Sequence, residues 1–171
     1  MDWSAVTARV VVEAAAAHRD DVVVDLGCGS GALALSLAPR VREVIAFDEV
    51  DHLPRPLPAN VRVATGKLSE PPVKGASVVV MNDALRRLPP REQAALIAEL
   101  GKAIPSRGLL VIGDVMWSLP VAMIDEPEQF GDAVAHAPEV ATVERQLRSA
   151  GFLPDTHRFG VGRAVIIALR G

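Results

Sequence analysis

The chain has 171 residues, half of them hydrophobic and 23% charged, and its formal net charge is -3. This length predicts one domain with a sizeable core, and the composition excludes a disordered polar chain and a generally basic nucleic-acid binder. Its single cysteine excludes a disulfide framework and a structural zinc site built on thiolates. Since no apolar run approaches the ~18 residues of a membrane span and no export signal is recognisable, we expect a cytoplasmic protein.

Helices and short apolar strands are predicted to alternate along the chain. The strands are β-branched runs without polar alternation, which is typical of parallel strands buried on both faces. In chain order the elements are a helix over 4–19 with Ser4 as its N-cap, a strand over 22–26, a helix over 32–38, strands over 44–47, 61–64 and 78–81, a helix over 92–104, a strand over 109–112, a helix over 140–150 and two strands within 152–169.

This alternation predicts the α/β class, with a Rossmann-like, doubly wound and mostly parallel sheet of seven strands that ends in an antiparallel hairpin. We expect a single domain over residues 1–171, with an N-terminal helix within 1–20 and an irregular, substrate-side insertion over 115–139. The segment between the second and third strands contains Pro54, Pro56 and Pro58. Prolines at this spacing break a helix, so the helix that usually joins such strands is predicted to be lost.

Ligands of such sheets bind at the carboxyl ends of the strands, near the point where the strand order reverses. The polar residues expected there are Asp25, Asp48, Asn82, Asp83 and Asp114. They are therefore the first candidates for a functional site.

The strongest signal is the loop after the first strand, which reads Asp25-Leu26-Gly27-Cys28-Gly29-Ser30-Gly31. Its glycines allow a sharp strand-to-helix turn and let a ligand lie against bare backbone. Asp48 follows at the end of the next strand, where a carboxylate can accept hydrogen bonds from both hydroxyls of a ribose. The glycine spacing departs from the dinucleotide pattern, and the acid at position 25 would suit a ligand with a cationic centre better than a pyrophosphate.

At these positions the sequence resembles a known family. VVVDLGCGSG, over residues 22–31, is similar to the first motif of class I S-adenosylmethionine-dependent methyltransferases, and Asp48 in VIAFDEVD matches the acidic second motif. VVVMNDALRRLP resembles the fourth motif of the type 11 branch, which is related to quinone-biosynthesis methyltransferases. The resemblance covers residues 22–171 and implies S-adenosylmethionine as the cofactor.

The resemblance implies a role for each matching residue. The loop residues, with Cys28 among them, would face the methionine part and the ribose, and Asp25 would hold the amino group. Asp48 would bind the ribose diol with help from Glu49, and Asn82 would lie near the reactive methyl. The implied cofactor-binding residues are Asp25, Gly27, Cys28, Gly29, Gly31, Asp48, Glu49, Lys67, Leu68 and Asn82.

Two positions depart from the family pattern. After the third strand the chain has Gly66-Lys67 where the family often has Gly-Asp, and a lysine cannot accept the hydrogen bond of the adenine amino group. The fourth strand is not followed by an Asn-Pro-Pro-aromatic motif, which disfavours methylation of adenine-type bases. Arg86 and Arg87 stand where the type 11 pattern often has a histidine. We interpret them, with Arg91, as a solvated surface at a helix start, with contact to an anionic substrate or partner as the alternative.

Methyl transfer from a sulfonium needs a general base only where the nucleophile still holds a proton. The candidates are Asp83, Asp114 and His136, although Asp83 and Asp114 could equally serve in turns. No pair of histidines has metal-ligand spacing, so no metal is expected. Cys28 is interpreted as small and packed, with a lowered thiol pKa at the helix start as the alternative.

The favoured function is methyl transfer to a small-molecule acceptor, with nucleic acid not expected as a partner. The alternative is a methyltransferase-like, non-catalytic partner subunit, which the shortened second crossover and Lys67 would suit. A nicotinamide dehydrogenase fits the fold but not the glycine spacing. A homodimer is a further hypothesis, since a second subunit could complete the thin wall of the cofactor site.

Overall fold

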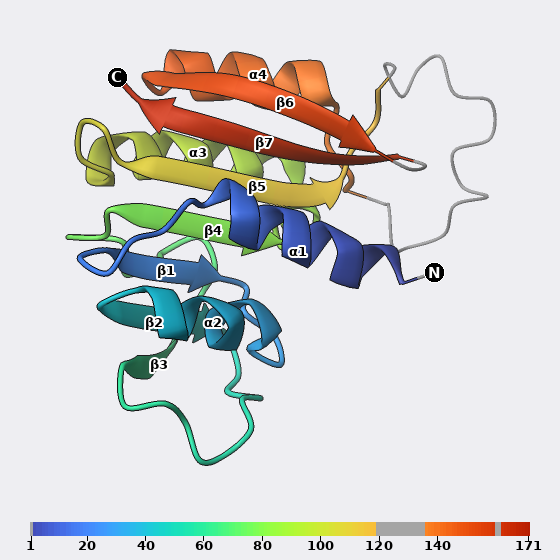
Figure 1. The fold of residues 1–171 in the computed structure, drawn as a ribbon. Helices are drawn as coiled ribbons and strands as arrows, with labels where there is room; N and C mark the ends of the chain where they lie inside the picture. Colours follow the sequence, from blue (N-terminus) through green and yellow to red (C-terminus); the bar gives the residue numbers. More distant parts are fainter. Residues whose placement is uncertain (1, 119–135, 160–161) are drawn as a thin grey trace.

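The computed structural model describes residues 2–118, 136–159 and 162–171. Seven strands form one sheet in the order β3-β2-β1-β4-β5-β7-β6 (Figure 1). Strands β1 to β5 pair in parallel, and β7 is antiparallel to both β5 and β6. This confirms the predicted mixed sheet. The strands are β1 (Val22–Leu26), β2 (Glu43–Asp48), β3 (Val61–Thr65), β4 (Val78–Asn82), β5 (Leu109–Val115), β6 (Phe152–Phe159) and β7 (Arg163–Arg170).

Helices cover both faces of this sheet, with α1 and α2 on one face and α3 and α4 on the other (Figure 1). The two layers explain the apolar strands, since successive side chains point to opposite faces and both faces are buried. On β4, for example, Val80 packs under α1 and α2, whereas Met81 packs under α3 and α4. The helices are α1 (Trp3–Ala14), α2 (Ala32–Leu37), α3 (Pro90–Ala103) and α4 (Val140–Ser149), with short 3₁₀ turns η1 (Ala38–Arg40) and η2 (Leu85–Arg87).

Residues 49–60, all of which the structure describes, contain no helix, although they join two parallel strands. The predicted loss of this helix is confirmed. Leu53 is the part of the connection that enters the core, where it packs with the residues under α2. Leu57 of the same connection is partly buried against this cluster, so apolar side chains of an irregular segment pack where a helix is usual.

The start of the chain differs from the prediction. The side chain of Asp2, not of Ser4, caps α1 by accepting hydrogen bonds from the backbone N–H groups of Ser4 and Ala5 at 3.0 and 3.1 Å. The helix ends at Ala14, because the next turn adopts a positive φ of 42° at Ala16. Asp2 satisfies two N–H groups that a helix start leaves unpaired, which frees the hydroxyl of Ser4 for a contact described below.

The fifth strand is also longer than predicted. β5 runs to Val115, so Asp114 lies within this strand rather than after it. β6 and β7 pair as far as Phe159 and Arg163, which confirms the hairpin, while residues 160–161 between them lie outside the described residues. Most of the expected insertion, residues 119–135, also lies outside them. Among the described helices none is long and apolar enough to span a membrane.

Candidate functional site

The glycine loop joins β1 to α2 at the carboxyl edge of the sheet. Gly27, Gly29 and Gly31 all have positive φ, at 75°, 52° and 78°. The backbone N–H groups of Gly27 and Cys28 both donate to the carbonyl of Phe47, at 2.8 and 3.1 Å. These bonds tie the loop to the end of β2, so that the loop and Asp48 are held side by side.

The three glycines have different surroundings. A Cβ on Gly27 would lie 2.5 Å from the Cβ of Ala84, and one on Gly31 would lie 2.6 Å from Cγ of Leu53. A Cβ on Gly29 would meet nothing within 4 Å. The close approaches at Gly27 and Gly31 are thus made by the chain itself, and the open space that a ligand could use lies beside Gly29.

Asp48 ends β2 with its side chain almost buried. Its Oδ2 accepts from the N–H of Gly29 at 2.9 Å and its Oδ1 from its neighbour Glu49 at 2.8 Å. The guanidinium of Arg87 donates to both oxygens, at 2.9 Å to Oδ1 and 3.1 Å to Oδ2. Burial raises the pKa of Asp48, but the hydrogen bonds from Arg87, Gly29 and Glu49 outweigh it and hold the pKa below the usual carboxyl range. Asp48 is therefore a stable carboxylate.

Asp25 lies deeper, in the middle of the sheet. Its Oδ2 accepts from the N–H of Ala34, in the first turn of α2, at 3.0 Å. Burial raises the pKa of Asp25 to about 7, partly countered by the Ala34 hydrogen bond. Asp25 thus fixes α2 on β1, and its charge is sensitive to any cation placed nearby.

The raised pKa of Asp25 leads to a prediction of how the free energy of unfolding depends on pH. Between about pH 4 and pH 7 the folded Asp25 keeps a proton that the unfolded chain releases, so the free energy of unfolding should fall as the pH rises through this window. Asp25→Asn should reduce that slope by up to about 1.4 kcal/mol per pH unit, the value of one proton. Urea denaturation from pH 4.5 to pH 8 measures the slope (roughly the range in which such a carboxyl titrates), and the exposed Asp20→Asn is the control. An unchanged slope in Asp25→Asn would contradict the prediction.

Cys28 is buried in the same loop. Burial, with the charges of Asp25 and Asp48 adding to it, raises the pKa of the Cys28 thiol to about 12. The thiol therefore stays protonated, which supports the interpretation of a small packed side chain and excludes the lowered pKa that was the alternative.

The remaining predicted cofactor residues lie at or after the carboxyl ends of β2, β3 and β4. Asn82 ends β4, the neighbour of β1, and its Oδ1 is buried and has no hydrogen-bond partner among the described residues. Glu49 is exposed beside Asp48. After β3, Lys67 is exposed and Leu68 is buried in the core under α3 and α4. Asn82 is thus the residue of this group whose polar atom most clearly lacks a partner.

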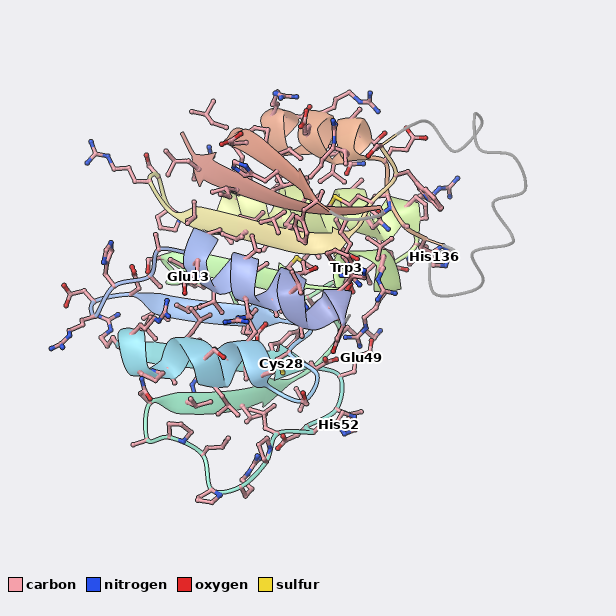
Figure 2. The ribbon with its side chains drawn as sticks, turned by 45° about the vertical axis from the view of Figure 1, so that its right-hand side comes forward. Trp3, Glu13, Cys28, Glu49, His52 and His136 are labelled. Atoms are coloured by element: carbon pink, nitrogen blue, oxygen red, sulfur yellow. The ribbon has the colours of Figure 1, made fainter. Side chains whose placement is uncertain are left out.

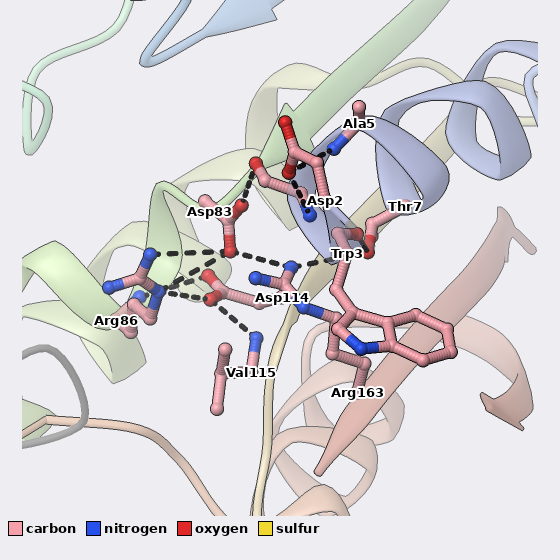
Figure 3. Close-up of polar contacts among 10 residues, drawn as sticks. Asp2, Trp3, Ala5, Thr7, Asp83, Arg86, Asp114, Val115 and Arg163 are labelled. Carbon is pink, nitrogen blue, oxygen red and sulfur yellow. Dashed lines mark hydrogen bonds and ion pairs between the residues drawn. The ribbon is translucent and has the colours of Figure 1, made fainter. Parts of the chain in front are cut away.

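Asp83 and Asp114 meet in a polar network at the ends of β4 and β5 (Figure 3). Asp83 accepts from Arg163 at 2.9 Å and from the hydroxyl of Ser4, and Arg86 contacts it at 3.3 Å. Asp114 accepts from the backbone N–H of Arg86 and lies 3.1 Å from its Nε. All four carboxylate oxygens of Asp83 and Asp114 therefore have partners (Figure 3).

The network joins segments that are far apart in the sequence. Arg163 of β7 also donates to Thr7 of α1, at 3.1 Å. Burial raises the pKa of Asp114 to about 7, with the Arg86 N–H acting in the opposite direction. The catalytic roles of Asp83 and Asp114 stay predictions, and in this structure both hold α1, η2 and β7 together.

The third candidate base, His136, is exposed and uses its backbone carbonyl to accept from Gln93 at 2.7 Å. Figure 2 shows Trp3, Cys28, Glu49 and His136 toward one end of the molecule, with Glu13 nearer the opposite end. No contact joins the His136 ring to Asp83 or Asp114 among the described residues. Its role as a base also stays a prediction.

The arginines of η2 correct the sequence interpretation. Arg86 and Arg87 do not form a merely solvated surface, because they bind Asp114, Asp83 and Asp48 at the ends of three strands. A usable signal was present: two arginines follow β4 in a sheet where acids stand at or near the carboxyl ends of β1, β2, β4 and β5. What the sequence could not supply was the geometry of η2, which turns Arg87 toward β2.

The cofactor implied by the resemblance can be tested against these residues. The open backbone at Gly29, the carboxylate of Asp48 beside it and the unpartnered Oδ1 of Asn82 suit a ribose and an amino group. Among the described residues, Arg87 is the side chain that already uses both Asp48 oxygens. The site therefore fits S-adenosylmethionine once Arg87 moves. For a metal, the described part of the chain contains no cluster of three or more suitable ligands.

Comparisons with known proteins agree with this geometry. A family model described as a methyltransferase domain matches residues 4–153. Ribosomal RNA small subunit methyltransferase A of Rhodococcus erythropolis is 32% identical over 163 residues, covering 93% of this chain and 53% of that protein. Carboxy-S-adenosyl-L-methionine synthase of a Shewanella species is 30% identical over 105 residues, covering 54% of this chain and 43% of that protein. The chain spans about half the length of the curated relatives it matches.

Solved structures show the same fold at low identity. A putative methyltransferase of Bacillus halodurans superposes with a TM-score of 0.77 at 15% identity, covering 95% of this chain and 97% of that one. Human N-acetylserotonin methyltransferase in complex with S-adenosylmethionine gives a TM-score of 0.74 at 18% identity, covering 99% of this chain and 53% of that one.

The fold is that of a class I S-adenosylmethionine-dependent methyltransferase domain. Because the family model covers most of its length, the chain belongs to the methyltransferase domain family, whose cofactor is S-adenosylmethionine. The resemblance to the type 11 branch is consistent with this membership.

Proposed function

We propose that this protein transfers a methyl group from S-adenosylmethionine to a small-molecule acceptor. The observation that supports the proposal is the arrangement of Asp48 beside the open backbone of Gly29. This arrangement lies where β1 and β2 end side by side, and it would form the ribose-binding position. A carboxylate here can accept from both ribose hydroxyls. The bound cofactor supplies a methyl group on a sulfonium, which is an electrophile with a good leaving group.

The residues of the chain would then bind and orient. Asp48 accepts hydrogen bonds from the ribose, and Oδ1 of Asn82 accepts one from the amino group of the methionine part, which would give this buried oxygen the partner it lacks. Asp25, whose pKa burial raises to about 7, would be favoured in its ionised form by the same cationic amino group if that group lies nearby. Holding the acceptor in line with the methyl group and excluding water would provide most of the rate enhancement.

A proton is accepted only for acceptors that must lose one. Asp114 has a pKa near neutrality, which suits a general base, but both of its oxygens are engaged. We infer that the main role of Asp83 and Asp114 is to hold Arg86 and Arg163 in place. These ion pairs would position the part of the site that binds the acceptor. A direct role as base would require one of these partners to move.

The acceptor class is argued from charge and sequence. Arg86, Arg87 and Arg163, the arginines nearest the strand ends, are paired with carboxylates, so they do not form a free basic surface for phosphates. The chain after β4 also lacks the Asn-Pro-Pro-aromatic sequence. The rRNA methyltransferases among its relatives favour an RNA acceptor as the second candidate.

The test has two stages. Calorimetric titration with S-adenosylmethionine and with S-adenosylhomocysteine should show micromolar binding, of the order of cofactor sites, that is lost in Asp48→Ala. Methyl-labelled cofactor is then incubated with a small-metabolite extract and, separately, with ribosomal RNA. Label in the small-molecule fraction supports the proposal, and label in RNA alone supports the second candidate. Absence of binding would point to a non-catalytic subunit instead.

A further inference from the structure

Arg87 makes the most complete ion pair at the site. Its two terminal nitrogens reach the two oxygens of Asp48 in parallel, in the bidentate arrangement that is the strongest form of this contact. The Asp48 side chain is 8% exposed and that of Arg87 is 42% exposed, so the guanidinium covers the carboxylate from the solvent side. Arg87 also lies over the glycine loop, since a Cβ on Gly27 would be 3.3 Å from its Nη1.

The hydrogen-bonding capacity of Asp48 is already used. Oδ1 accepts from Glu49 N–H and Arg87, and Oδ2 accepts from Gly29 N–H and Arg87, which gives two donors to each oxygen. The two N–H donors belong to backbone that the loop and the strand hold in place. Only the Arg87 side chain can leave and make room for two ribose hydroxyls.

We propose that Arg87 is an internal competitor for the ribose of the cofactor: binding exchanges the Arg87–Asp48 ion pair for ribose–Asp48 hydrogen bonds. This inference rests on the proposed function, because it takes Asp48 as the ribose seat. By this exchange Arg87 would lower the affinity for the cofactor. Arg87 belongs to η2, which follows β4, so the affinity would depend on a residue outside the glycine loop and β2.

The surroundings of Arg87 allow the exchange without unfolding η2. The preceding Arg86 is anchored by Asp83 and Asp114, and the Arg87 backbone N–H donates to Ala84 at 3.1 Å, so the turn stays in place when the side chain swings. The hydrogen bond to Asp48, followed by the charges of Asp48 and Glu49, raises the pKa of Arg87. The exposed Glu49 therefore offers a second carboxylate close to the released guanidinium.

The experiment compares the unchanged protein with Arg87→Ala and Arg87→Lys by calorimetric titration. Two probes are used: S-adenosylhomocysteine, and 5′-methylthioadenosine, which keeps the ribose and adenine but lacks the amino acid. Arg87→Ala should bind both probes about tenfold more tightly, the value of a charge-assisted contact that need not be broken. Arg87→Lys, which can offer only one point contact, should give an intermediate gain.

The matched control is Arg62→Ala, which removes another arginine–carboxylate pair, with Glu43 at the opposite end of β2. It should leave both affinities unchanged. Weaker binding of S-adenosylhomocysteine alone in Arg87→Ala would overturn the inference, because Arg87 would then bind the methionine carboxylate. Weaker binding of both probes, or no change, would overturn it too. If neither the unchanged protein nor any variant binds either probe, the proposed function fails.

Discussion

Asp48→Asn is expected to weaken S-adenosylmethionine binding by about 100-fold, since two hydrogen bonds to a charged acceptor become weaker or are lost. Asparagine keeps the size of the side chain but offers one acceptor oxygen and no charge. The N–H groups of Gly29 and Glu49 donate to different oxygens of Asp48, so the single amide oxygen would keep one of these two hydrogen bonds and lose the other. Calorimetry with the cofactor measures the effect.

The control for this variant is Glu43→Gln. Glu43 begins the strand that Asp48 ends, and its half-buried carboxylate also pairs with an arginine, Arg62. The two substitutions make the same chemical change at opposite ends of β2, so only Asp48→Asn should affect the cofactor. Binding by Asp48→Asn as tight as that of the unchanged protein would place the ribose elsewhere.

Gly27→Ala is expected to cost about 3 kcal/mol or more in the free energy of unfolding. A left-handed conformation costs a residue with a side chain about 1–2 kcal/mol, and overpacking adds about 1–3 kcal/mol. Here the new Cβ would lie 2.5 Å from the Cβ of Ala84, which sits in the buried turn after β4. Urea denaturation at constant pH measures the loss.

Gly29→Ala separates the two contributions to that loss. Gly29 also has a positive φ, but a Cβ there meets nothing within 4 Å, so the variant should lose only the conformational part, about 1–2 kcal/mol. It should nevertheless lose cofactor affinity, because its methyl group fills the space proposed for the ligand. Equal destabilisation by the two variants would show that the contact with Ala84 is unimportant. A double variant, Gly27→Ala with Ala84→Gly, should recover the packing part only.

The sequence predicted correctly those features that depend on neighbouring residues in the same strand or turn. The apolar runs predicted the strands, the positions of Gly27, Gly29 and Gly31 predicted a sharp strand-to-helix turn, and Asp48 was expected at the end of its strand. Three prolines predicted the missing helix between β2 and β3. Each of these inferences depends on local backbone chemistry, which neighbouring residues largely decide.

The sequence was less informative where the role depends on a side chain reaching another element. Arg87 looked solvated because its partner lies 39 residues earlier, on a strand two positions away in the sheet. Ser4 looked like a helix cap, but its hydroxyl donates to Asp83. The close approaches at Gly27 and Gly31 were attributed to a ligand, whereas Ala84 and Leu53 make them. Such pairings depend on strand order and on the geometry of 3₁₀ turns, and neither has a periodic signature.

The position of the first helix has a practical consequence for work with this protein. Asp2 caps α1, Ser4 binds Asp83 and Thr7 binds Arg163, so the first turns of the chain belong to the polar network that we propose as the acceptor side of the site. Figure 1 places the N-terminus at the end of the sheet where the parallel strands finish, and the C-terminus at the other end. Any segment attached ahead of Asp2, natural or engineered, would emerge beside the entrance that we propose for the acceptor. An affinity tag is therefore better placed after Gly171, away from that entrance.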